Sequence, residues 1–356
     1  MFTRTEPVKA TKSIKIGHWP AFAQGFPLRS AHISTKQLGW HKPKKHSMPV
    51  KPRPLLTATI ATDEISRVIA KDLNLGSVTS MSRAGSSGWA VMHKATTDKG
   101  KRLFIKVSRE DAEMFEGERE GLYAMFKTNT IRVPEAYHCG RLNGVQGSFI
   151  IMESLDLHAI YSQERLGDQL GKMHLAEPVV AEAKQGKFGF VVDNTLGATP
   201  QPNGWMDDWV EFFRERRLRH QLLLTNDANL ITKGDELCSR LDELFEDVKG
   251  TIKPSILHGD LWSGNVSGLG RTAEPVIFDP ASYYGHHEAE FGMSWCMDLT
   301  SAFWGAYRNH IPEAEGFKRR LKLYQLYHYL NHFNLFGGGY YGMSDLLLTQ
   351  LLKGIN

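Results

Sequence analysis

One short segment constrains this 356-residue chain more than any other part of it. Residues 257–265 read "LHGDLWSGN", so that His258, Asp260 and Asn265 stand close together beside two glycines. A second aspartate, Asp279, follows the apolar run "VIF" at 276–278. Asp, Asn and Gly are common in turns, so one explanation is a pair of turn aspartates after buried strands. The other is a site in which carboxylate and amide oxygens hold a metal ion.

The spacing of the segment favours the second explanation. The pattern H-x-D-L-x-x-x-N matches the catalytic loop of protein kinases, except that Gly259 stands in place of an arginine. The five-residue offset lets a compact loop present Asp260 to an acceptor hydroxyl while Asn265 turns back to a metal ion. Asp279 stands where a kinase places its metal-binding aspartate. Phosphoryl transfer needs positioning and charge neutralisation, so we predict Asp260 as the base and Asn265 and Asp279 as magnesium ligands.

Gly259 also narrows the class of kinase. Without the arginine, an activation-loop phosphate has no partner in this segment. No A-P-E triplet follows Asp279 either. Both features favour a kinase of small molecules or modified side chains over a signalling protein kinase.

An upstream lysine and glutamate fit the same chemistry. Lys106 lies in the strand-like run "LFIKVS", where a kinase places the lysine that pairs with phosphates. Glu118 follows twelve residues later on a predicted helix, where it would hold Lys106 in an ion pair. Three other glutamates share that helix and remain alternatives to Glu118: Glu113, Glu116 and Glu120. A lysine in a strand or a glutamate in a helix is, by itself, usually a solvated surface residue.

Two further segments are expected to bind ATP. The run "SRAGSSGWA" at 82–90 would cover the phosphates with backbone amides near Gly85 and Ser86, although it lacks a strict G-x-G-x-x-G. The absence of a Walker A motif counts against a P-loop NTPase. The adenine edge would be read by the backbone where the strand "SFIIMESL" ends, at Met152, Glu153, Ser154 and Leu155.

The order of predicted elements gives an α+β fold. Globular patterning begins near Ala61, with Thr62 as a helix cap, and residues 61–155 alternate helix, strands, helix and strand. From residue 156 to 356 helices dominate. A hydrophobic content of 41% allows a sizeable core, and no apolar run reaches the length of a membrane helix.

The charge of the chain is divided unevenly. Residues 1–58 hold eleven of the 43 basic residues and one of the 39 acidic ones, which leaves 32 basic and 38 acidic residues in the remainder. The body is therefore mildly acidic, and no nucleic-acid surface is indicated. Residues 1–60 are predicted to be a basic leader, either a disordered tail or a transit peptide for a chloroplast or mitochondrion. Without targeting the protein would be cytoplasmic, and Met48 offers an internal start.

Other features of the sequence carry less chemistry. Cys139, Cys238 and Cys296 lie far apart, which argues against a disulfide framework or a structural zinc site. "HYLNH" puts His328 and His332 one helical turn apart, but we expect a core helix there. "FGGGYY" reads as a helix end, and "RERRLRH" at 214–220 as a solvated helical face.

Taken together, the motifs resemble the fructosamine-3-kinase (ketosamine-3-kinase) family, relatives of aminoglycoside phosphotransferases. The resemblance covers roughly residues 62–353. It rests on "FEGEREGL" (115–122), "SFIIME" (148–153), "GKMH" (171–174), "FGFVVDNTLGATPQPNGW" (188–205), "DWVEFF" (208–213), "LHGDLWSGN" (257–265), "DPASYYGHHEAEFGMS" (279–294) and "YQLYHYLNHFNLFGGGY" (324–340).

The resemblance implies a two-lobed, protein-kinase-like fold with a small β-rich N-lobe and a larger, mainly helical C-lobe. It implies ATP and Mg²⁺ as cofactors and glycated proteins or small ketosamines as substrates, phosphorylated on the 3-hydroxyl; ribulosamines are preferred by most non-vertebrate members. The 3-phosphate then eliminates and frees the amine. The substrate residues implied are Trp262, His258, His286 and Glu288.

The resemblance also bears on assembly. Some family members carry a cysteine in the glycine-rich loop, through which redox-controlled dimers form, and the aligned residue here is Ser86. We therefore expect a monomer or weak dimer with no disulfide switch in that loop, and no membrane partner.

Two rival functions remain open at this point. The first is a kinase of another small hydroxyl compound, such as choline or an aminoglycoside. The second is a catalytically dead ATP-binding scaffold, against which the joint presence of Lys106, Asp260, Asn265 and Asp279 argues.

Overall fold

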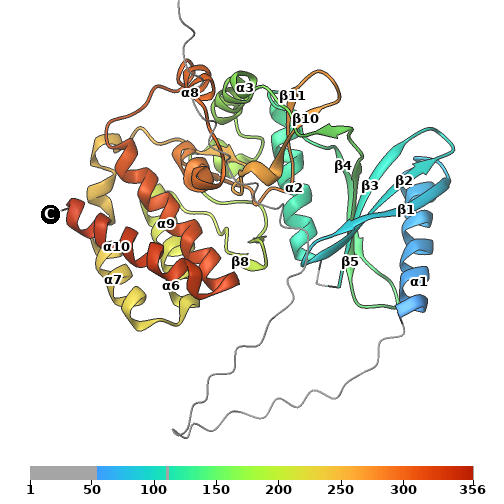
Figure 1. Cartoon of the computed structure of the whole chain (residues 1–356), viewed down its shortest axis with the longest axis horizontal. Helices are drawn as coiled ribbons and strands as arrows, with labels where there is room; N and C mark the ends of the chain where they lie inside the picture. The colour runs from blue at the N-terminus through green and yellow to red at the C-terminus, as the bar shows by residue number, and fades with distance from the viewer. Residues whose placement is uncertain (1–53, 110–111, 356) are drawn as a thin grey trace, which may run out of the picture. The chain divides into compact units, whose positions relative to one another are not determined.

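The computed structural model describes residues 54–109 and 112–355 (Figure 1). These residues belong to one compact unit, Arg53–Asn356, and side chains are described from Ala61 onward. The predicted leader lies outside the described residues, except that its last seven residues are helical.

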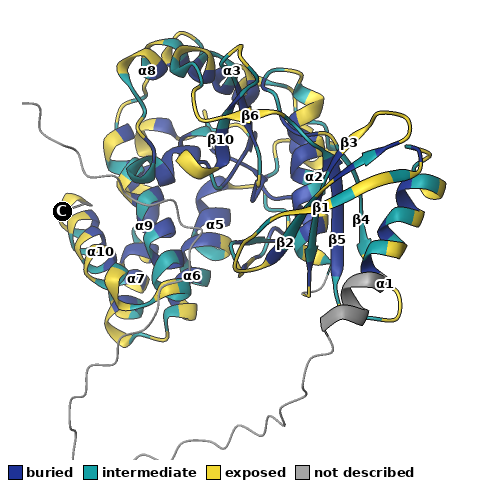
Figure 2. Ribbon diagram, turned by 45° about the vertical axis from the view of Figure 1, so that its right-hand side comes forward, coloured by how far each residue is buried: buried dark blue, intermediate teal, exposed yellow. Residues whose placement is uncertain are grey.

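A five-stranded antiparallel sheet organises the N-terminal part of this unit. Its strands stand in the order β1-β2-β3-β5-β4. Their bounds are Val78–Ser86 (β1), Ala90–Thr97 (β2), Arg102–Ser108 (β3), Ala136–Arg141 (β4) and Ser148–Glu153 (β5). β5 is buried on both faces along most of its length (Figure 2). Because side chains alternate along β3, Leu103 and Ile105 face one side of the sheet while Phe104 and Lys106 face the other.

Helices cover both faces of this sheet (Figure 1). On one face lie α1 (Pro54–Arg67) and the π-helical turn η1 (Val68–Asp72), whose Ile65 and Ile69 pack against Leu103 and Ile105. The helix begins at Pro54, so Thr62 lies inside it and does not cap it as we expected. On the other face lies α2 (Glu113–Thr128), which ends at Asn129 in the left-handed conformation.

The remainder is mainly helical and shares one large apolar core with α2 and the facing side of the sheet. Its helices are α3 (Gln163–Leu175), α4 (Ala181–Lys184), α5 (Trp209–Phe213), η2 (Arg214–Arg219), α6 (His220–Thr225), α7 (Ala228–Ser239), η3 (Leu241–Leu244), η4 (Glu246–Val248), η5 (Ser263–Asn265), η6 (His287–Cys296), α8 (Ser301–Arg308), α9 (Phe317–Phe336), η7 (Gly338–Tyr340) and α10 (Tyr341–Ile355). Its strands are β6 (Leu157–His158), β7 (Asn194–Leu196), β8 (Thr199–Gln201), β9 (Ser255–Leu257), β10 (Val266–Leu269), β11 (Glu274–Ile277) and β12 (Tyr283–Gly285).

The basic segment at 214–220 differs from the prediction of a solvated face. Arg217 is fully buried, its guanidinium lies 4.0 Å from the ring centre of Tyr283, and it donates to the side chain of Asn203 at 2.5 Å. Burial of an arginine costs less when its terminal nitrogens donate hydrogen bonds and its flat face is stacked, and both conditions hold here, although Nε has no partner among the described residues. Arg217 is therefore part of the core.

The helix with the histidine pair is a core helix, as predicted. His328 is buried, as are Tyr324, Tyr327 and Leu330 of the same helix α9. The ring nitrogen Nδ1 of His332 donates to the carbonyl of His328 at 2.8 Å. No helix among the described residues is long and apolar enough to cross a membrane.

Candidate active site

The loop after β9 carries the first part of the site. His258 is buried; its Nε2 donates to the carbonyl of Phe278 at 2.8 Å, and its Nδ1 accepts from the amide of Asp260 at 3.3 Å. The amide of Ala281 donates back to the carbonyl of His258 at 2.9 Å. His258 thus ties the loop to the segment that carries Asp279, and it is too deeply buried to meet a substrate directly.

The predicted base and metal ligands lie together. The Asn265 side-chain amide donates to the backbone oxygen of Asp260 at 2.9 Å, to its carboxylate at 3.2 Å and to the backbone oxygen of Asp279 at 3.4 Å. β10 and β11 form a hairpin, and the pairing of Val266 with Ile277 returns the chain to this point. Because the Asn265 nitrogen is committed to these bonds, its amide oxygen is the atom left to accept a metal ion.

Lys106, on strand β3 of the sheet, forms ion pairs with Glu118 and with Asp279. Its ammonium group donates to Glu118 on α2 at 2.7 Å and also binds the carboxylate of Asp279. Burial alone would lower the pKa of Lys106, but the charges of Asp279 and Glu118 outweigh it and raise the pKa. Burial raises the pKa of Glu118. Of the four glutamates on α2, Glu118 is the one that reaches the lysine.

The charge on Asp260 depends on its surroundings. Burial, followed by the charge of Asp279, raises the pKa of Asp260 to about 8. The hydrogen bond from Asn265 acts in the opposite direction. A divalent cation held by Asn265 and Asp279 would favour the ionised carboxylate, because an opposite charge nearby lowers the pKa of an acid.

Gly259 is required by the backbone geometry of the loop. Its φ is +79°, and a Cβ added there would lie 2.1 Å from the carbonyl oxygen of Ala281. A residue with a side chain at this position would therefore separate the loop from the segment that follows Asp279. The glycine that replaces the kinase arginine is thus a structural requirement of this loop.

The sequence did not predict a buried carboxylate that binds the backbone of the 258–265 loop from the protein interior. Glu290, on η6, is buried and accepts the backbone amides of His258 at 2.7 Å and Gly259 at 3.0 Å. His174 donates to Glu290 at 3.2 Å and accepts from the hydroxyl of Tyr307 at 2.8 Å. Burial acts to raise the pKa of Glu290, but the bonds and charge of His174 outweigh it and lower the pKa. Glu290 and His174 lie in two of the motifs on which the family resemblance rests. Those motifs were the only features of the sequence that pointed to them.

The structure does not bring two other predicted residues to the acceptor side of Asp260. His286 is buried, and its Nδ1 accepts from the hydroxyl of Tyr324 at 2.8 Å. Glu288 is buried and binds the guanidinium of Arg320 at 2.7 and 2.8 Å. Nδ1 of His286 and both carboxylate oxygens of Glu288 are already bonded in the interior, so contact of these atoms with a substrate would require this part of the core to open.

Trp262 and the β1–β2 hairpin carry the predicted acceptor and phosphate residues. Trp262 is partly exposed two residues after the base, and its ring covers Gly264 so closely that a Cβ there would lie 2.3 Å from it. Gly85 and Ser86 are the last residues of β1, not loop residues as we expected, and the turn is shorter. The hydroxyl oxygen of Ser87 accepts the amides of Trp89 and Ala90 and so fixes that turn.

The end of β5 is held on both sides. The amide of Glu153 donates to the carbonyl of Glu135 at 2.8 Å and that of Ser154 to the carbonyl of Arg102 at 3.0 Å. The Glu153 carboxylate pairs with Arg132. Met152 is buried in the core. Within this segment the amide of Leu155 makes no backbone hydrogen bond to any described residue.

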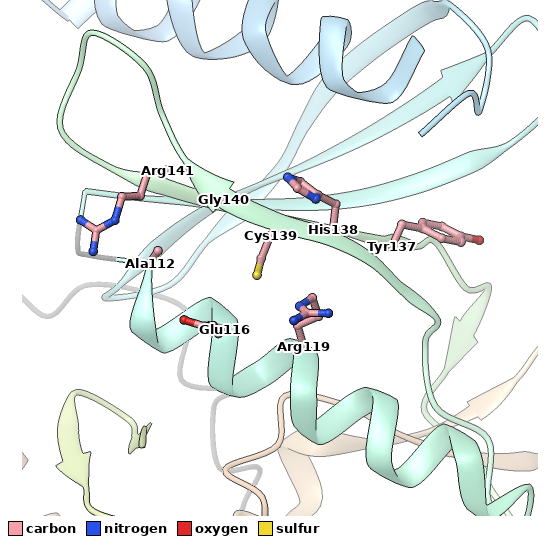
Figure 3. A pocket seen from close by; sticks show the side chains of 8 residues that line it. All are labelled: Ala112, Glu116, Arg119, Tyr137, His138, Cys139, Gly140 and Arg141. Carbon is pink, nitrogen blue, oxygen red and sulfur yellow. The ribbon is translucent and has the colours of Figure 1, made fainter. Parts of the chain in front are cut away.

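A cavity of about 450 Å³ lies elsewhere, between α2 and β4 (Figure 3). Its lining includes Glu116 and Arg119 of α2, and Cys139 points from β4 toward this helix. Lys106 and the catalytic loop are not among its lining residues, so the cavity is separate from the site described above.

The fold and the connected set of Lys106, Glu118, Asp260, Asn265 and Asp279 define a kinase-like phosphotransferase. Comparison with known proteins narrows the class: the model of the fructosamine kinase family matches residues 62–354. The chain belongs to this family.

Relatives with assigned names support the same family. The chain is 43% identical over 312 residues to protein-ribulosamine 3-kinase, chloroplastic, of Arabidopsis thaliana, covering 85% of this chain and 92% of the relative. It is 37% identical over 312 residues to ketosamine-3-kinase of Mus musculus, covering 80% and 99%.

Solved structures confirm the kinase-like, two-lobed α+β fold. A putative fructosamine-3-kinase from Thermobifida fusca matches with a TM-score of 0.69 and 26% identity, covering 82% of this chain and 99% of that one. An aminoglycoside phosphotransferase, solved as a ternary complex with AMP-PNP and hygromycin B, matches with a TM-score of 0.52 and 14% identity, covering 82% and 97%.

Proposed function

We propose that this protein transfers the γ-phosphoryl group of ATP to the 3-hydroxyl of ketosamines on glycated lysines. Ribulosamines are the proposed first choice, because the plant relative at 43% identity is named for them. The observation that carries the proposal is the connected set of Lys106, Glu118, Asp260, Asn265 and Asp279 in a member of the fructosamine kinase family. A scaffold that only bound nucleotide would have no chemical need for all five.

Asp260 is the proposed base. It would accept a hydrogen bond from the 3-hydroxyl and orient the oxygen toward the γ-phosphorus, a role that typically contributes ~10²–10⁴-fold to rate. The Asn265 amide holds the Asp260 carboxylate from the side, and Glu290 holds the backbone that carries it. The geometry that presents the base is therefore built by the protein before any substrate binds.

Asn265 and Asp279 are the proposed Mg²⁺ ligands. The donor set fits, because Mg²⁺ prefers carboxylate and amide oxygens and the Asn265 oxygen is free to accept. When bound, the ion would neutralise charge on the transferred phosphoryl group and its leaving group. Asp279 has a φ of +58°, unusual for a residue with a side chain, which points to a backbone held for function.

ATP is proposed to bind between the β1–β2 hairpin and the catalytic loop. Lys106, held by Glu118, would pair with the α and β phosphates, while Gly85 and Ser86 would cover them with backbone groups. The adenine would meet the backbone of Met152–Leu155. Within that segment the amide of Leu155, which makes no backbone hydrogen bond to any described residue, is the donor most suited to a ring nitrogen.

The acceptor is proposed to lie beside Trp262, whose partly exposed ring suits the apolar face of a sugar. His258, His286 and Glu288 would act indirectly, by supporting the loop and the core beneath it. Residues 61–155 and 156–356 are proposed as the two lobes.

The basic leader is proposed to address a plastid, because the Arabidopsis and rice relatives are named as chloroplastic. The family match begins at residue 62, after the leader. With serine at position 86, a monomer or weak dimer without a disulfide in the hairpin is proposed.

The proposal is tested by ATP consumption of the leaderless protein with ribulosyl-lysine, fructosyl-lysine and choline offered separately. Turnover of a ketosamine supports the proposal and ranks the two sugars. Turnover of choline alone would make the protein a kinase of another hydroxyl compound, and ATP binding without turnover would favour a scaffold.

A further inference from the structure

Five aromatic side chains form a cluster on the helical part of the protein, here called the aromatic platform. Its members are Trp295, Tyr329, His332, Phe336 and Tyr340. Trp295 stacks on Tyr329 with ring centres 4.5 Å apart and planes 18° apart. His332 contacts Tyr340 at 5.0 Å and Phe336 at 5.6 Å.

The aromatic platform is not core. Phe336 is 62% exposed and the other four rings are partly exposed. The neighbouring glycines 337–339 face open space, since a Cβ added at any of them would meet no atom within 4 Å. A contiguous group of partly exposed aromatic rings at the surface often marks a binding site.

One short helix connects the aromatic platform to the catalytic loop. Trp295 belongs to the same short helix, η6, as Glu290, which binds the backbone amides of His258 and Gly259. At the rise of a 3₁₀ helix the two residues are about 10 Å apart along the axis. Burial and the nearby charge of Asp260 raise the pKa of Cys296, the next residue, to about 12.

The charge around the aromatic platform favours a cationic ligand. Residues 272–307 and 323–352 supply all five rings and contain no Lys or Arg. The π faces of the rings are electron-rich and attract cations. An anionic ligand would find no positive partner in either segment.

We propose that the aromatic platform binds the amine-bearing stem of the acceptor, the protonated secondary amine and methylene chain of a glycated lysine. This inference rests on the proposed function. In a ketosamine the nitrogen is three bonds from the carbon that bears the 3-hydroxyl, or about 4 Å. An acceptor whose hydroxyl meets Asp260 therefore carries its positive charge about 4 Å from the reacting carbon, and the methylene chain of the lysine extends beyond it. The aromatic platform would select amine adducts over free sugars.

The test compares Trp295→Leu and Tyr340→Leu with the unchanged protein on two acceptors. One is ribulosyl-lysine, and the other is its derivative acetylated on the ketosamine nitrogen, which is neutral. We expect the KM for ribulosyl-lysine to rise about 3–30-fold, as the loss of one cation–π contact implies. The KM for ATP, and the KM for the acetylated acceptor, should change less than twofold. Tyr123→Leu, which removes an exposed ring on α2, is the control and should leave the KM for each of the two acceptors unchanged.

An unchanged KM for ribulosyl-lysine in both variants, with folding intact, would overturn the inference. An equal rise for the two acceptors would overturn the role of the charge. Calorimetric binding of ε-N-methyl-lysine, which has the amine and no sugar, separates this inference from the proposed function. Binding that is lost in Trp295→Leu supports the aromatic platform even if no ketosamine is turned over, whereas absence of binding counts against it.

Discussion

The carboxylate of Glu290 accepts a hydrogen bond from the backbone amide of His258 at 2.7 Å, and this contact anchors the catalytic loop from the interior. The second oxygen accepts the amide of Gly259 at 3.0 Å. The next residue of the loop is Asp260. A buried, charged acceptor thus fixes the backbone that carries the proposed base.

Replacing Glu290 by Gln should lower kcat while leaving the KM for ATP nearly unchanged. Glutamine keeps one acceptor but turns an N–H₂ group toward the second backbone amide, and a hydrogen bond to a charged group is worth about 1.5–3 kcal/mol. We expect kcat to fall about 10–100-fold. Steady-state kinetics would show this, with Glu236→Gln, an exposed carboxylate on α7, as the matched control. Wild-type kcat in a folded Glu290→Gln protein would contradict the anchoring role.

Gly259→Ala should destabilise the protein and abolish activity. The added Cβ would meet the carbonyl of Ala281 at 2.1 Å in addition to the positive φ of +79°. Gly250→Ala separates these two effects, because Gly250 has a φ of +75° with open space around its Cβ position. Gly250→Ala should lower the free energy of unfolding by only about 1–2 kcal/mol, the cost of a left-handed backbone for a residue with a side chain. Denaturant unfolding of the two variants would compare them, and equal losses would show that the contact with Ala281 is not decisive.

Lys106→Met should affect both stability and turnover. The change leaves the buried carboxylate of Glu118 without its cation, and breaking a buried ion pair in this way costs about 3–5 kcal/mol. Loss of one donor to the phosphates should lower kcat/KM about 10²–10³-fold. Lys94→Met, on the neighbouring strand β2 with an exposed side chain, should alter neither.

The double variant Lys106→Met, Glu118→Met distinguishes the two effects. It removes both charges, so thermal unfolding should recover much of the lost stability while activity stays low. Recovery of activity together with stability would mean that Lys106 acts only through the fold.

The stability of the protein should fall as the pH drops from 7 to 5. Burial lowers the pKa of His287 and of His328 to about 3, so the folded protein keeps both rings neutral while the unfolded chain binds protons near pH 6.5. The stabilisation is complete above pH 6.5 and is lost progressively as pH falls toward 3. Each residue should contribute about 2 kcal/mol of that loss by pH 5.

Unfolding curves of His328→Gln between pH 5 and 7 would measure this contribution. The variant should show a shallower dependence of unfolding free energy on pH than the unchanged protein. His158→Gln, which replaces an exposed histidine, should leave the slope as it was. A slope that His328→Gln does not alter would show that His328 is not a source of the dependence.

Local pattern predicted much of the fold. The run "LFIKVS" was predicted to be a strand that carries Lys106, and it lies within β3 (Arg102–Ser108), because strand preference is a local property of these residues. A helix that carries Glu118 was also predicted, and α2 (Glu113–Thr128) is that helix. The start of α1 at Pro54 was not predicted, because the basic composition of residues 1–58 led us to assign this part of the chain to a leader.

The site was predictable only in part. The spacing of residues 258–265 with Asp279 identified the residues that meet, because one loop and one hairpin bring them together. Glu290 could not be found by spacing, since its partners lie 31 and 32 residues earlier. The burial of Arg217 and His286 depends on rings from distant segments, Tyr283 and Tyr324, which no local pattern reveals.

The most direct measurement is the mass change of ribulosyl-lysine after incubation with ATP, Mg²⁺ and the leaderless protein, compared with Asp260→Asn. The unchanged protein should add one phosphoryl group to the sugar, and Asp260→Asn should be slower by about 10²–10⁴-fold. Asp298→Asn, at an exposed position, should match the unchanged protein. A wild-type rate in Asp260→Asn, or no phosphorylated product from the unchanged protein, would contradict the account.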